Sequence, residues 1–479
     1  MDVFALLAGT QERSARRLAV VDGARRLDYG EVHRRVGALA RGLGARGVRA
    51  GDRVAILAPN GVEFLEATFA TAGIGAILVP LNVRLAPREI AEILKRSGAR
   101  ALICDPALAP DAADALRIGP EYEALLERHA GSLAPVAVAG DAVAQIYFTS
   151  GTTGRPKGVL LTHRNVCAHA RAAILELGLG EEDVWGHFAP MFHLADAWAT
   201  LAITAVGGTH AMLPRFDAEA ALAAIERERV TITNLVPTML NLMVRHPRAR
   251  GTDASSLRLL LTGGAPIAPA LVQDALATFR CAYAPTYGMT ETSPFLTISG
   301  RAFRAVELRV VGDDGADVPR DGHSVGEIRA RGETVTPGYF EDPAATREAF
   351  EDGWLKTGDL AVVDPEGSIA IVDRRKDVIK TGGEAVYSAE VENALYAHPA
   401  VLEAAVFGVP DPLWGESVRA AVVLRPGAHA TEAELAEACR ALVAGYKVPR
   451  AIAFLTELPR VGSGKIAKRI LREIYGRDA

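Results

Sequence analysis

Residues 147–159 read Tyr-Phe-Thr-Ser-Gly-Thr-Thr-Gly-Arg-Pro-Lys-Gly-Val. An apolar stretch, residues 145–148, leads into what we call the glycine–threonine loop (residues 149–158), which holds three glycines, three threonines, a serine and a lysine. Glycines let backbone N–H groups point at an anion, hydroxyl groups add donors, and Lys157 adds positive charge. The spacing is not that of the Walker A loop. An ordinary polar turn is the competing interpretation, but the length of the loop and its lysine favour a polyphosphate site.

Short apolar segments alternate with amphipathic segments on both sides of this loop. Strands are predicted at residues 53–57, 76–79, 101–104, 203–213, 231–235 and 257–261. Helices are predicted between them, at residues 61–72, 87–97 and 218–229. This alternation predicts an α/β fold in which helices cover mostly parallel sheets.

The pattern changes in the last third of the chain. From about residue 305 it becomes β-rich, a charged run occupies residues 373–377, and a small α+β segment follows. We therefore predict a large domain over residues 1–372, with its β-rich part at about 305–372, and a hinge at 373–376. A small α+β domain is predicted over residues 377–479.

Three further segments carry side chains that suit a nucleotide. Residues 287–292 read Tyr-Gly-Met-Thr-Glu-Thr and combine a planar ring, a hydroxyl group and a carboxylate. Residues 353–359 read Gly-Trp-Leu-Lys-Thr-Gly-Asp, and an aspartate after a strand-like run is a good acceptor for ribose hydroxyls. Residues 462–466 read Gly-Ser-Gly-Lys-Ile, with a lysine near the end of the chain. Each segment alone is also compatible with a solvated surface turn.

Taken together, these segments resemble the adenylate-forming superfamily of acyl- and aryl-CoA synthetases, nonribosomal adenylation domains and luciferases. The resemblance runs from about residue 27 to about residue 470, keeps the family order, and looks closest to fatty-acyl and aryl acid–CoA ligases. It implies a large N-terminal adenylate-binding domain and a small mobile C-terminal lid domain that carries a catalytic lysine.

The resemblance also implies roles for individual residues. The expected catalytic residues are Lys465, Thr290, Glu291 and His193, with Glu291 holding Mg²⁺. The expected ATP- and AMP-binding residues are Thr149, Ser150, Gly151, Thr152, Thr153, Gly154, Lys157, Gly264, Ala265, Pro266, Tyr287, Gly288, Asp359 and Arg374. The expected acyl pocket contains His193, Trp198, Gly263 and Gly264. Lys376 matches the hinge, and Thr381, Gly382 and Gly383 match the CoA channel.

The implied activity uses ATP, Mg²⁺ and coenzyme A to convert a hydrophobic carboxylic acid into a thioester through an acyl-adenylate. Adenylation is needed because the carboxylate oxygen is a poor leaving group, whereas AMP departs readily. Four alternatives remain open: thioester formation with weakened adenylation, loading of an acyl carrier protein, a non-catalytic nucleotide binder, and a luciferase-like oxygenase. The first is motivated by residues 293–305, which are short compared with the family pattern and border the adenylate segment.

Composition narrows the range of partners and locations. The 479 residues are 49% hydrophobic and 23% charged, with a formal net charge of -5, so a nucleic-acid partner is not expected. The sequence contains no uninterrupted apolar run long enough to cross a membrane, so a membrane span is not expected. The four cysteines are far apart, which favours a reducing cytoplasm over a disulfide-stabilised fold. The oligomeric state stays open, with a homodimer among the alternatives.

Overall fold

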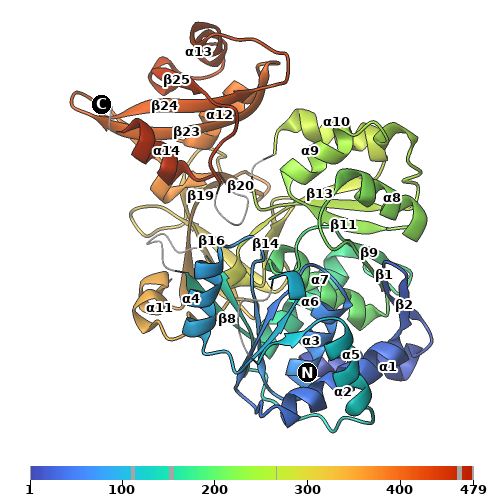
Figure 1. Ribbon diagram of the computed structural model, residues 1–479. Helices are drawn as coiled ribbons and strands as arrows, with labels where there is room; N and C mark the ends of the chain where they lie inside the picture. The colour runs from blue at the N-terminus through green and yellow to red at the C-terminus, as the bar shows by residue number, and fades with distance from the viewer. Residues whose placement is uncertain (1, 109–113, 150–155, 266, 461–465, 477–479) are drawn as a thin grey trace. The chain divides into compact units, whose positions relative to one another are not determined.

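The computed structural model describes residues 2–108, 114–149, 156–265, 267–460 and 466–476 (Figure 1). The predicted α/β fold is confirmed. The chain forms two compact units, which are described separately. The first comprises Met1–Leu308 and Ala330–Leu355, and the second comprises Arg309–Arg329 and Lys356–Ala479. The hinge expected at residues 373–376 stays a prediction, because compactness does not show where a chain bends.

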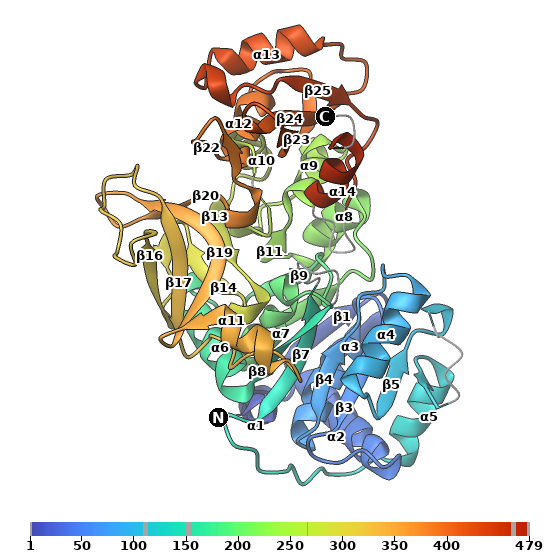
Figure 2. The same cartoon turned by 90° about the vertical axis from the view of Figure 1, so that its left-hand side faces the viewer.

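A six-stranded sheet in the first unit carries the glycine–threonine loop. Its strand order is β6-β5-β3-β4-β7-β8, and only β7 and β8 are antiparallel neighbours. The strands are β3 (Arg53–Leu57), β4 (Ile77–Pro80), β5 (Ala101–Cys104), β6 (Leu116–Arg117), β7 (Val143–Thr149) and β8 (Lys157–Thr162). The accompanying helices are α2 (Tyr29–Ala45), α3 (Val62–Gly73), α4 (Pro87–Ser97) and α5 (Pro120–Arg128) (Figure 2). The predicted alternation of strands and helices is confirmed in this region.

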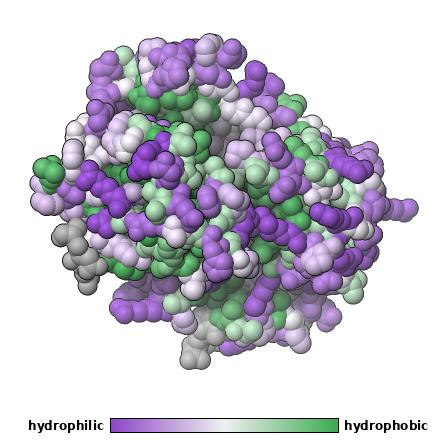
Figure 3. Space-filling view, turned by 90° about the horizontal axis from the view of Figure 1, so that it is seen from above, coloured by the Kyte–Doolittle hydropathy of each residue, from purple (hydrophilic) through white to green (hydrophobic). Residues whose placement is uncertain are grey.

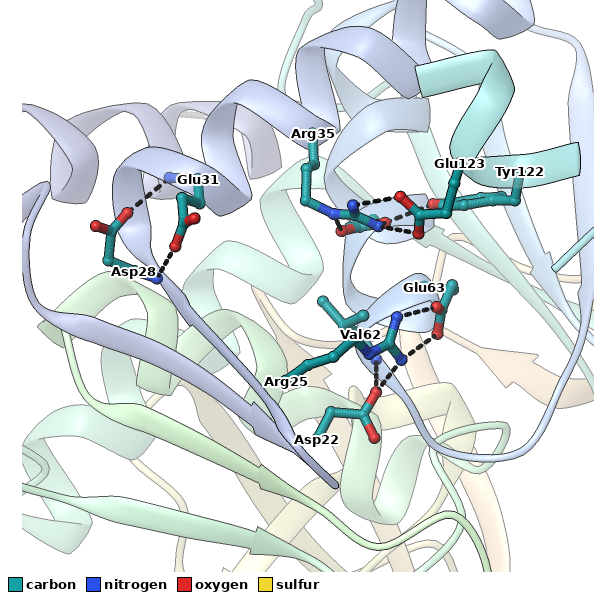
Figure 4. Close-up of polar contacts among 10 residues, drawn as sticks. Asp22, Arg25, Asp28, Glu31, Arg35, Val62, Glu63, Tyr122 and Glu123 are labelled. Atoms are coloured by element: carbon teal, nitrogen blue, oxygen red, sulfur yellow. Dashed lines mark hydrogen bonds and ion pairs between the residues drawn. The ribbon is translucent and has the colours of Figure 1, made fainter. Parts of the chain in front are cut away.

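Ion pairs of Arg35, one of them with a buried carboxylate, join three of these helices. Arg35 on α2 contacts Glu66 on α3 with Nε 2.5 Å from Oε1, and Glu123 on α5 with Nη1 2.7 Å from Oε2. The Tyr122 hydroxyl donates to Glu66 Oε2 at 2.6 Å. Figure 4 shows Arg35 facing Tyr122 and Glu123 of the neighbouring helix. Because Glu66 is fully buried, these contacts offset the free-energy cost of removing its carboxylate from water.

A nine-stranded sheet in the same unit carries the acid and adenine segments. Its order is β15-β14-β13-β12-β11-β9-β10-β1-β2. The six strands from β13 to β1 in this order run parallel to their neighbours. The strands are β1 (Leu18–Asp22), β2 (Arg25–Asp28), β9 (Val184–His187), β10 (Thr209–Met212), β11 (Ile232–Leu235), β12 (Leu259–Thr262), β13 (Ala282–Gly288), β14 (Phe295–Ile298) and β15 (Arg301–Ala302). The helices are α1 (Val3–Ser14), α6 (His163–Leu177), α7 (Leu194–Val206), α8 (Ala218–Glu228), α9 (Pro237–Arg245) and α10 (Pro269–Phe279).

The strand predicted at residues 203–213 is partly wrong. Helix α7 continues to Val206, Gly207 ends it with a φ of 79°, and the strand β10 begins only at Thr209. Ten of the thirteen residues of α7 are buried. A helix that is buried on nearly all sides lacks a polar face, so its sequence does not show a helical period.

The β-rich prediction from residue 305 onward is confirmed. One five-stranded sheet has the order β16-β17-β19-β18, with β20 paired to β19. It contains β16 (Val306–Val311), β17 (Gly326–Gly332), β18 (Phe350–Glu351), β19 (Trp354–Val363) and β20 (Ile369–Arg374), and the helix α11 (Pro343–Ala349) precedes β18.

The small α+β segment has its own sheet and core. Its sheet has the order β22-β21-β24-β23, with β25 paired to β24. The strands are β21 (Ile379–Thr381), β22 (Glu384–Val386), β23 (Val401–Asp411), β24 (Gly415–Leu424) and β25 (Ala451–Phe454). The helices are α12 (Ser388–Tyr396), α13 (Glu432–Arg440) and α14 (Lys468–Tyr475). Val391, Val406 and Leu435 are among the buried side chains that hold α12 and α13 against one face of this sheet.

Apolar residues on the surface are interspersed with polar ones. On the face drawn in Figure 3, hydrophilic and hydrophobic residues alternate over short distances. Among the described residues, no helix is both long and apolar enough to span a bilayer.

Candidate active site

The glycine–threonine loop connects two antiparallel strands of the first unit. Thr149 ends β7 and is paired with Lys157, the first residue of β8. The Thr149 hydroxyl donates to the Lys157 carbonyl at 3.4 Å. Five expected phosphate-binding residues lie outside the described residues: Ser150, Gly151, Thr152, Thr153 and Gly154. The two described ends therefore place Lys157 at the point where the loop returns to the sheet.

A tyrosine that the sequence analysis did not select links Lys157 to Glu291. The Tyr339 hydroxyl donates to Glu291 Oε1 at 2.9 Å, and Lys157 Nζ lies 5.1 Å from the centre of the Tyr339 ring. Burial raises the pKa of Tyr339, and the Glu291 carboxylate raises it further, so the phenol stays protonated and can donate. The first unit thus brings a cation, a phenol and a buried carboxylate together.

The backbone around Tyr339 is fixed by hydrogen bonds to β8. The Leu160 amide donates to the Gly338 carbonyl at 3.1 Å, and the Phe340 amide donates to the Gly158 carbonyl at 2.7 Å. The Thr336 amide donates to the Glu291 carbonyl at 2.8 Å. The segment before α11 therefore holds both the loop strand and Glu291 by its main chain.

The expected adenine segment lies at the end of β13 and in the short 3₁₀ helix Thr290–Thr292. Tyr287, Gly288 and Thr290 are half-buried, while Glu291 is only 7% exposed. A Cβ atom on Gly288 would lie 1.9 Å from the Pro294 carbonyl oxygen, so no other residue fits here without moving the backbone. Glycine at this position lets the chain fold back directly after the tyrosine.

Glycine stands at the two positions after β12 for different reasons. A Cβ atom on Gly263 would lie 2.5 Å from the Thr286 hydroxyl, so Gly263 permits close packing against β13. Gly264 has a φ of 82° and is exposed, as is Ala265, while Pro266 lies outside the described residues. The acyl-pocket role expected for Gly263 stays a prediction.

His193 and Trp198 belong to the start of α7. His193 is the N-cap residue, half-buried, with its ring 4.8 Å from that of Phe192. Trp198 is 2% exposed, and its Nε1 donates to the Ala195 carbonyl at 3.1 Å. Asn234, at the end of β11, donates to the same carbonyl at 2.7 Å. The expected acid-binding segment is therefore fixed by two side-chain donors on one backbone oxygen.

The second unit holds the expected ribose-binding pair. Asp359 and Arg374 are opposite each other on β19 and β20, with Arg374 Nε 3.3 Å from Asp359 Oδ1. The carboxylate of Asp359 is mostly buried, while the Arg374 side chain is 48% exposed. This arrangement orients the carboxylate and leaves the arginine accessible to a ligand.

The expected hinge and CoA residues lie on adjacent short elements of the same unit. Lys376 is exposed in the 3₁₀ turn Arg375–Asp377. Thr381 ends β21, and Gly382 and Gly383 form the turn to β22 with φ values of 59° and 87°. Both angles are left-handed and suit glycine in a tight hairpin. Lys465 lies outside the described residues.

Comparison with known proteins adds the family. The family model described as AMP-binding enzyme matches residues 7–340, and that of the AMP-binding enzyme C-terminal domain matches residues 390–465. The chain belongs to the AMP-binding enzyme family.

This AMP-binding enzyme is similar to named CoA ligases over nearly its whole length. It is 42% identical to feruloyl-CoA synthase of Amycolatopsis sp, covering 96% of each chain. It is 37% identical to long-chain-fatty-acid–CoA ligase FadD13 of Mycobacterium tuberculosis, covering 94% of this chain and 93% of the other. It matches o-succinylbenzoate CoA synthetase of Bacillus subtilis, solved with the acyl-adenylate OSB-AMP, with a TM-score of 0.89, 31% identity and 98% of each chain covered. The predicted family and the predicted class, an acid–thiol ligase, are confirmed.

The sequence analysis missed two polar residues of the AMP-binding enzyme near its expected site. Tyr339 follows Gly338 in a stretch of proline, threonine and glycine that reads as a loop, and nothing in that stretch points to Glu291. Asn234 carries an amide near the end of a strand. The only sequence signal for its role is that it precedes Pro237, where the next helix begins. Both roles depend on contacts between distant segments.

Proposed function

We infer that this AMP-binding enzyme is an acid–CoA ligase that acts on hydrophobic carboxylic acids. It forms an acyl-adenylate from ATP and the acid and transfers the acyl group to the thiol of coenzyme A. The observation that carries this function is the arrangement of Lys157, Tyr339 and Glu291 beside the glycine–threonine loop. A cation and a buried carboxylate at one place suit a metal-bound triphosphate. The two CoA ligases and the acyl-adenylate complex among its relatives support the same reaction.

In the first half-reaction, an oxygen of the acid's carboxylate attacks the α-phosphorus of ATP, and the bond to pyrophosphate breaks. Tyr287 packs on the adenine, Thr290 contacts the α-phosphate, and Lys465 neutralises charge as it moves from the carboxylate to the phosphate. Asp359 and Arg374 hold the ribose. These groups act by positioning and electrostatic stabilisation, because no protein nucleophile is needed.

Glu291 is the residue that would hold Mg²⁺. Magnesium is often bound by one or two carboxylates together with the phosphates of the substrate. The described residues contain no group of three or more acidic, histidine or cysteine side chains placed to bind a metal. When bound, Mg²⁺ would offset the charge of the triphosphate and favour the departure of pyrophosphate.

In the second half-reaction, the CoA thiol attacks the acyl carbon, and AMP leaves with the oxygen that joined the acid to phosphorus. The Gly382–Gly383 turn is the proposed channel for the pantetheine arm, because nothing lies within 4 Å of a Cβ atom built on Gly383. Lys376 is the proposed hinge of the small domain. Rotation about it lets Lys465 face the adenylate in the first half-reaction and the Gly382–Gly383 turn face it in the second. An exposed residue in a single 3₁₀ turn can change its backbone angles at low cost.

The residues around the start of α7 support a hydrophobic acid as the substrate. Leu194, Ala197 and Trp198 are apolar and buried, and they directly follow His193. The named relatives act on an aromatic acid and on long-chain fatty acids, so the proposed range covers both classes.

The test is acid-dependent exchange of labelled pyrophosphate into ATP, followed by thioester formation with CoA. We expect exchange with hydrophobic acids and equal amounts of AMP and thioester once CoA is added. A phosphopantetheinylated carrier protein, supplied in place of CoA, should accept the acyl group poorly. Absence of exchange with every acid, or formation of ADP in place of AMP, would contradict the proposal.

A further inference from the structure

His169 is a buried histidine without a hydrogen-bond partner. It lies on α6, is 1% exposed, and neither ring nitrogen finds a partner among the described residues. The contrast with other buried histidines is clear: His163 Nδ1 accepts from the Val3 amide at 3.1 Å, and His210 Nδ1 lies 3.0 Å from His187 Nε2. Buried polar groups are nearly always paired, so an unpaired one requires an explanation.

Three aromatic rings surround this imidazole. Its ring centre lies 5.3 Å from that of Trp198, 5.0 Å from that of Phe295 and 5.0 Å from that of Phe303. We call His169 and these three residues the aromatic cage. Burial lowers the pKa of His169 to about 3, so the imidazole is neutral at pH 7 and presents one donor and one acceptor. An apolar side chain could fill the same space without leaving two polar atoms unpaired.

The aromatic cage includes Trp198 of the proposed acid site and lies beside the adenine segment. Trp198 follows His193 on α7 and is tied to the Ala195 carbonyl. Phe295 stands opposite Gly288 across β13 and β14, next to the adenine segment. Phe303 follows β15, the second strand of the hairpin that closes the short segment 293–305, and its amide donates to the Leu296 carbonyl at 2.8 Å. The hairpin thus supplies two of the three aromatic walls.

We propose that His169 determines acid specificity by binding a hydrogen-bonding substituent, such as a phenolic hydroxyl, at the end of an aromatic acid far from its carboxylate. This inference rests on the proposed function. Aromatic walls favour a planar ring, and a hydroxyl group, which both donates and accepts, can pair with either nitrogen of the imidazole. Trp198 and Phe295 are in contact in this structure, with ring centres 5.0 Å apart, so the proposal requires one of these rings to turn before the substituent can reach the imidazole. An aliphatic chain leaves both nitrogens unpaired.

The test compares 4-hydroxycinnamate with cinnamate, which differ by one hydroxyl group, and adds a straight-chain fatty acid of similar length. We expect the wild type to favour the hydroxylated acid by at least about tenfold in kcat/KM. His169→Phe should bring this ratio to about one while cinnamate is still turned over. His169→Gln keeps a donor and an acceptor and should restore part of the preference.

Thr200→Val is the matched control. Thr200 is also on a buried helix, is 1% exposed, and has a hydroxyl without a partner in the described part of the chain, but it lies on the face of α7 opposite Trp198. Its replacement should leave the ratio unchanged. If His169→Phe raises Tm and keeps the preference, the cage is only packing and the inference is wrong. If the wild type shows no preference, or activates only fatty acids, the inference about His169 is also wrong. The proposed function stands in both cases. Absence of pyrophosphate exchange with every hydrophobic acid tried removes both the inference and the proposed function.

Discussion

Tyr339→Phe isolates the hydrogen bond that holds Glu291. The substitution keeps the ring and its contact with Lys157 and removes only the hydroxyl that donates to Glu291 Oε1 at 2.9 Å. A hydrogen bond to a charged group contributes about 1.5–3 kcal/mol. At about 1.4 kcal/mol for each factor of ten, this corresponds to roughly 10–150-fold. Because Tyr339 is only partly buried, we expect a loss near the lower end, about tenfold.

The loss should appear as a change in magnesium dependence. In pyrophosphate exchange, Tyr339→Phe should need about ten times more Mg²⁺ for half-maximal rate, because a less oriented Glu291 binds the metal more weakly. Transfer from a synthetic acyl-adenylate to CoA should be unaffected, since that reaction does not require the triphosphate.

Tyr122→Phe is the matched control, because its hydroxyl also donates to a buried carboxylate, Glu66 Oε2, at 2.6 Å. Tyr122 lies on α5 in the ion-pair cluster of Figure 4, which has no proposed role in catalysis. We expect it to lower the free energy of unfolding and to leave the magnesium dependence unchanged. An unchanged magnesium requirement in Tyr339→Phe, or an equal change in both variants, would refute the reasoning.

Three further predictions concern charge. Arg35→Met should lower the free energy of unfolding by about 3–5 kcal/mol in a urea titration, because it leaves the fully buried Glu66 without its cation; a loss below about 1 kcal/mol would show that the pair is effectively solvated. Burial raises the pKa of Asp183, but hydrogen bonds, led by that from Arg258, bring it below its usual value. Asp183→Asn should therefore destabilise the protein at neutral pH, and the difference from the wild type should shrink as pH falls through the lowered folded-state pKa, whereas a constant difference would exclude this linkage. Asp359→Asn should raise the KM for ATP by about tenfold with little effect on transfer to CoA, measured by steady-state kinetics.

The sequence predicts best what depends on local pattern. The strands at 53–57 and 101–104 and the helix at 87–97 agree with β3, β5 and α4 in both bounds, because their apolar periods are clear and glycine or proline marks their ends. Short motifs predict Thr149, Lys157 and Glu291 as site residues, and the structure places Lys157 near the ring and Glu291 at the hydroxyl of one tyrosine.

What the sequence did not predict depends on contacts between distant segments. Tyr339 acquires its role only when residues 338–340 pair with β8. His169 is an ordinary helical residue until α7 and the hairpin of β14 and β15 enclose it. The start of residues 203–213 looked like a strand because a helix buried on nearly all sides has no polar face.

The central claim is that the carboxylate of the acid attacks the α-phosphorus of ATP. The most direct measurement uses an acid labelled with ¹⁸O in both carboxylate oxygens and follows the label by mass spectrometry after a complete turnover with CoA. The account predicts one labelled oxygen in each AMP, because the attacking oxygen leaves with the phosphate when the thiol takes the acyl group. AMP without label, or label in inorganic phosphate together with ADP, would contradict it.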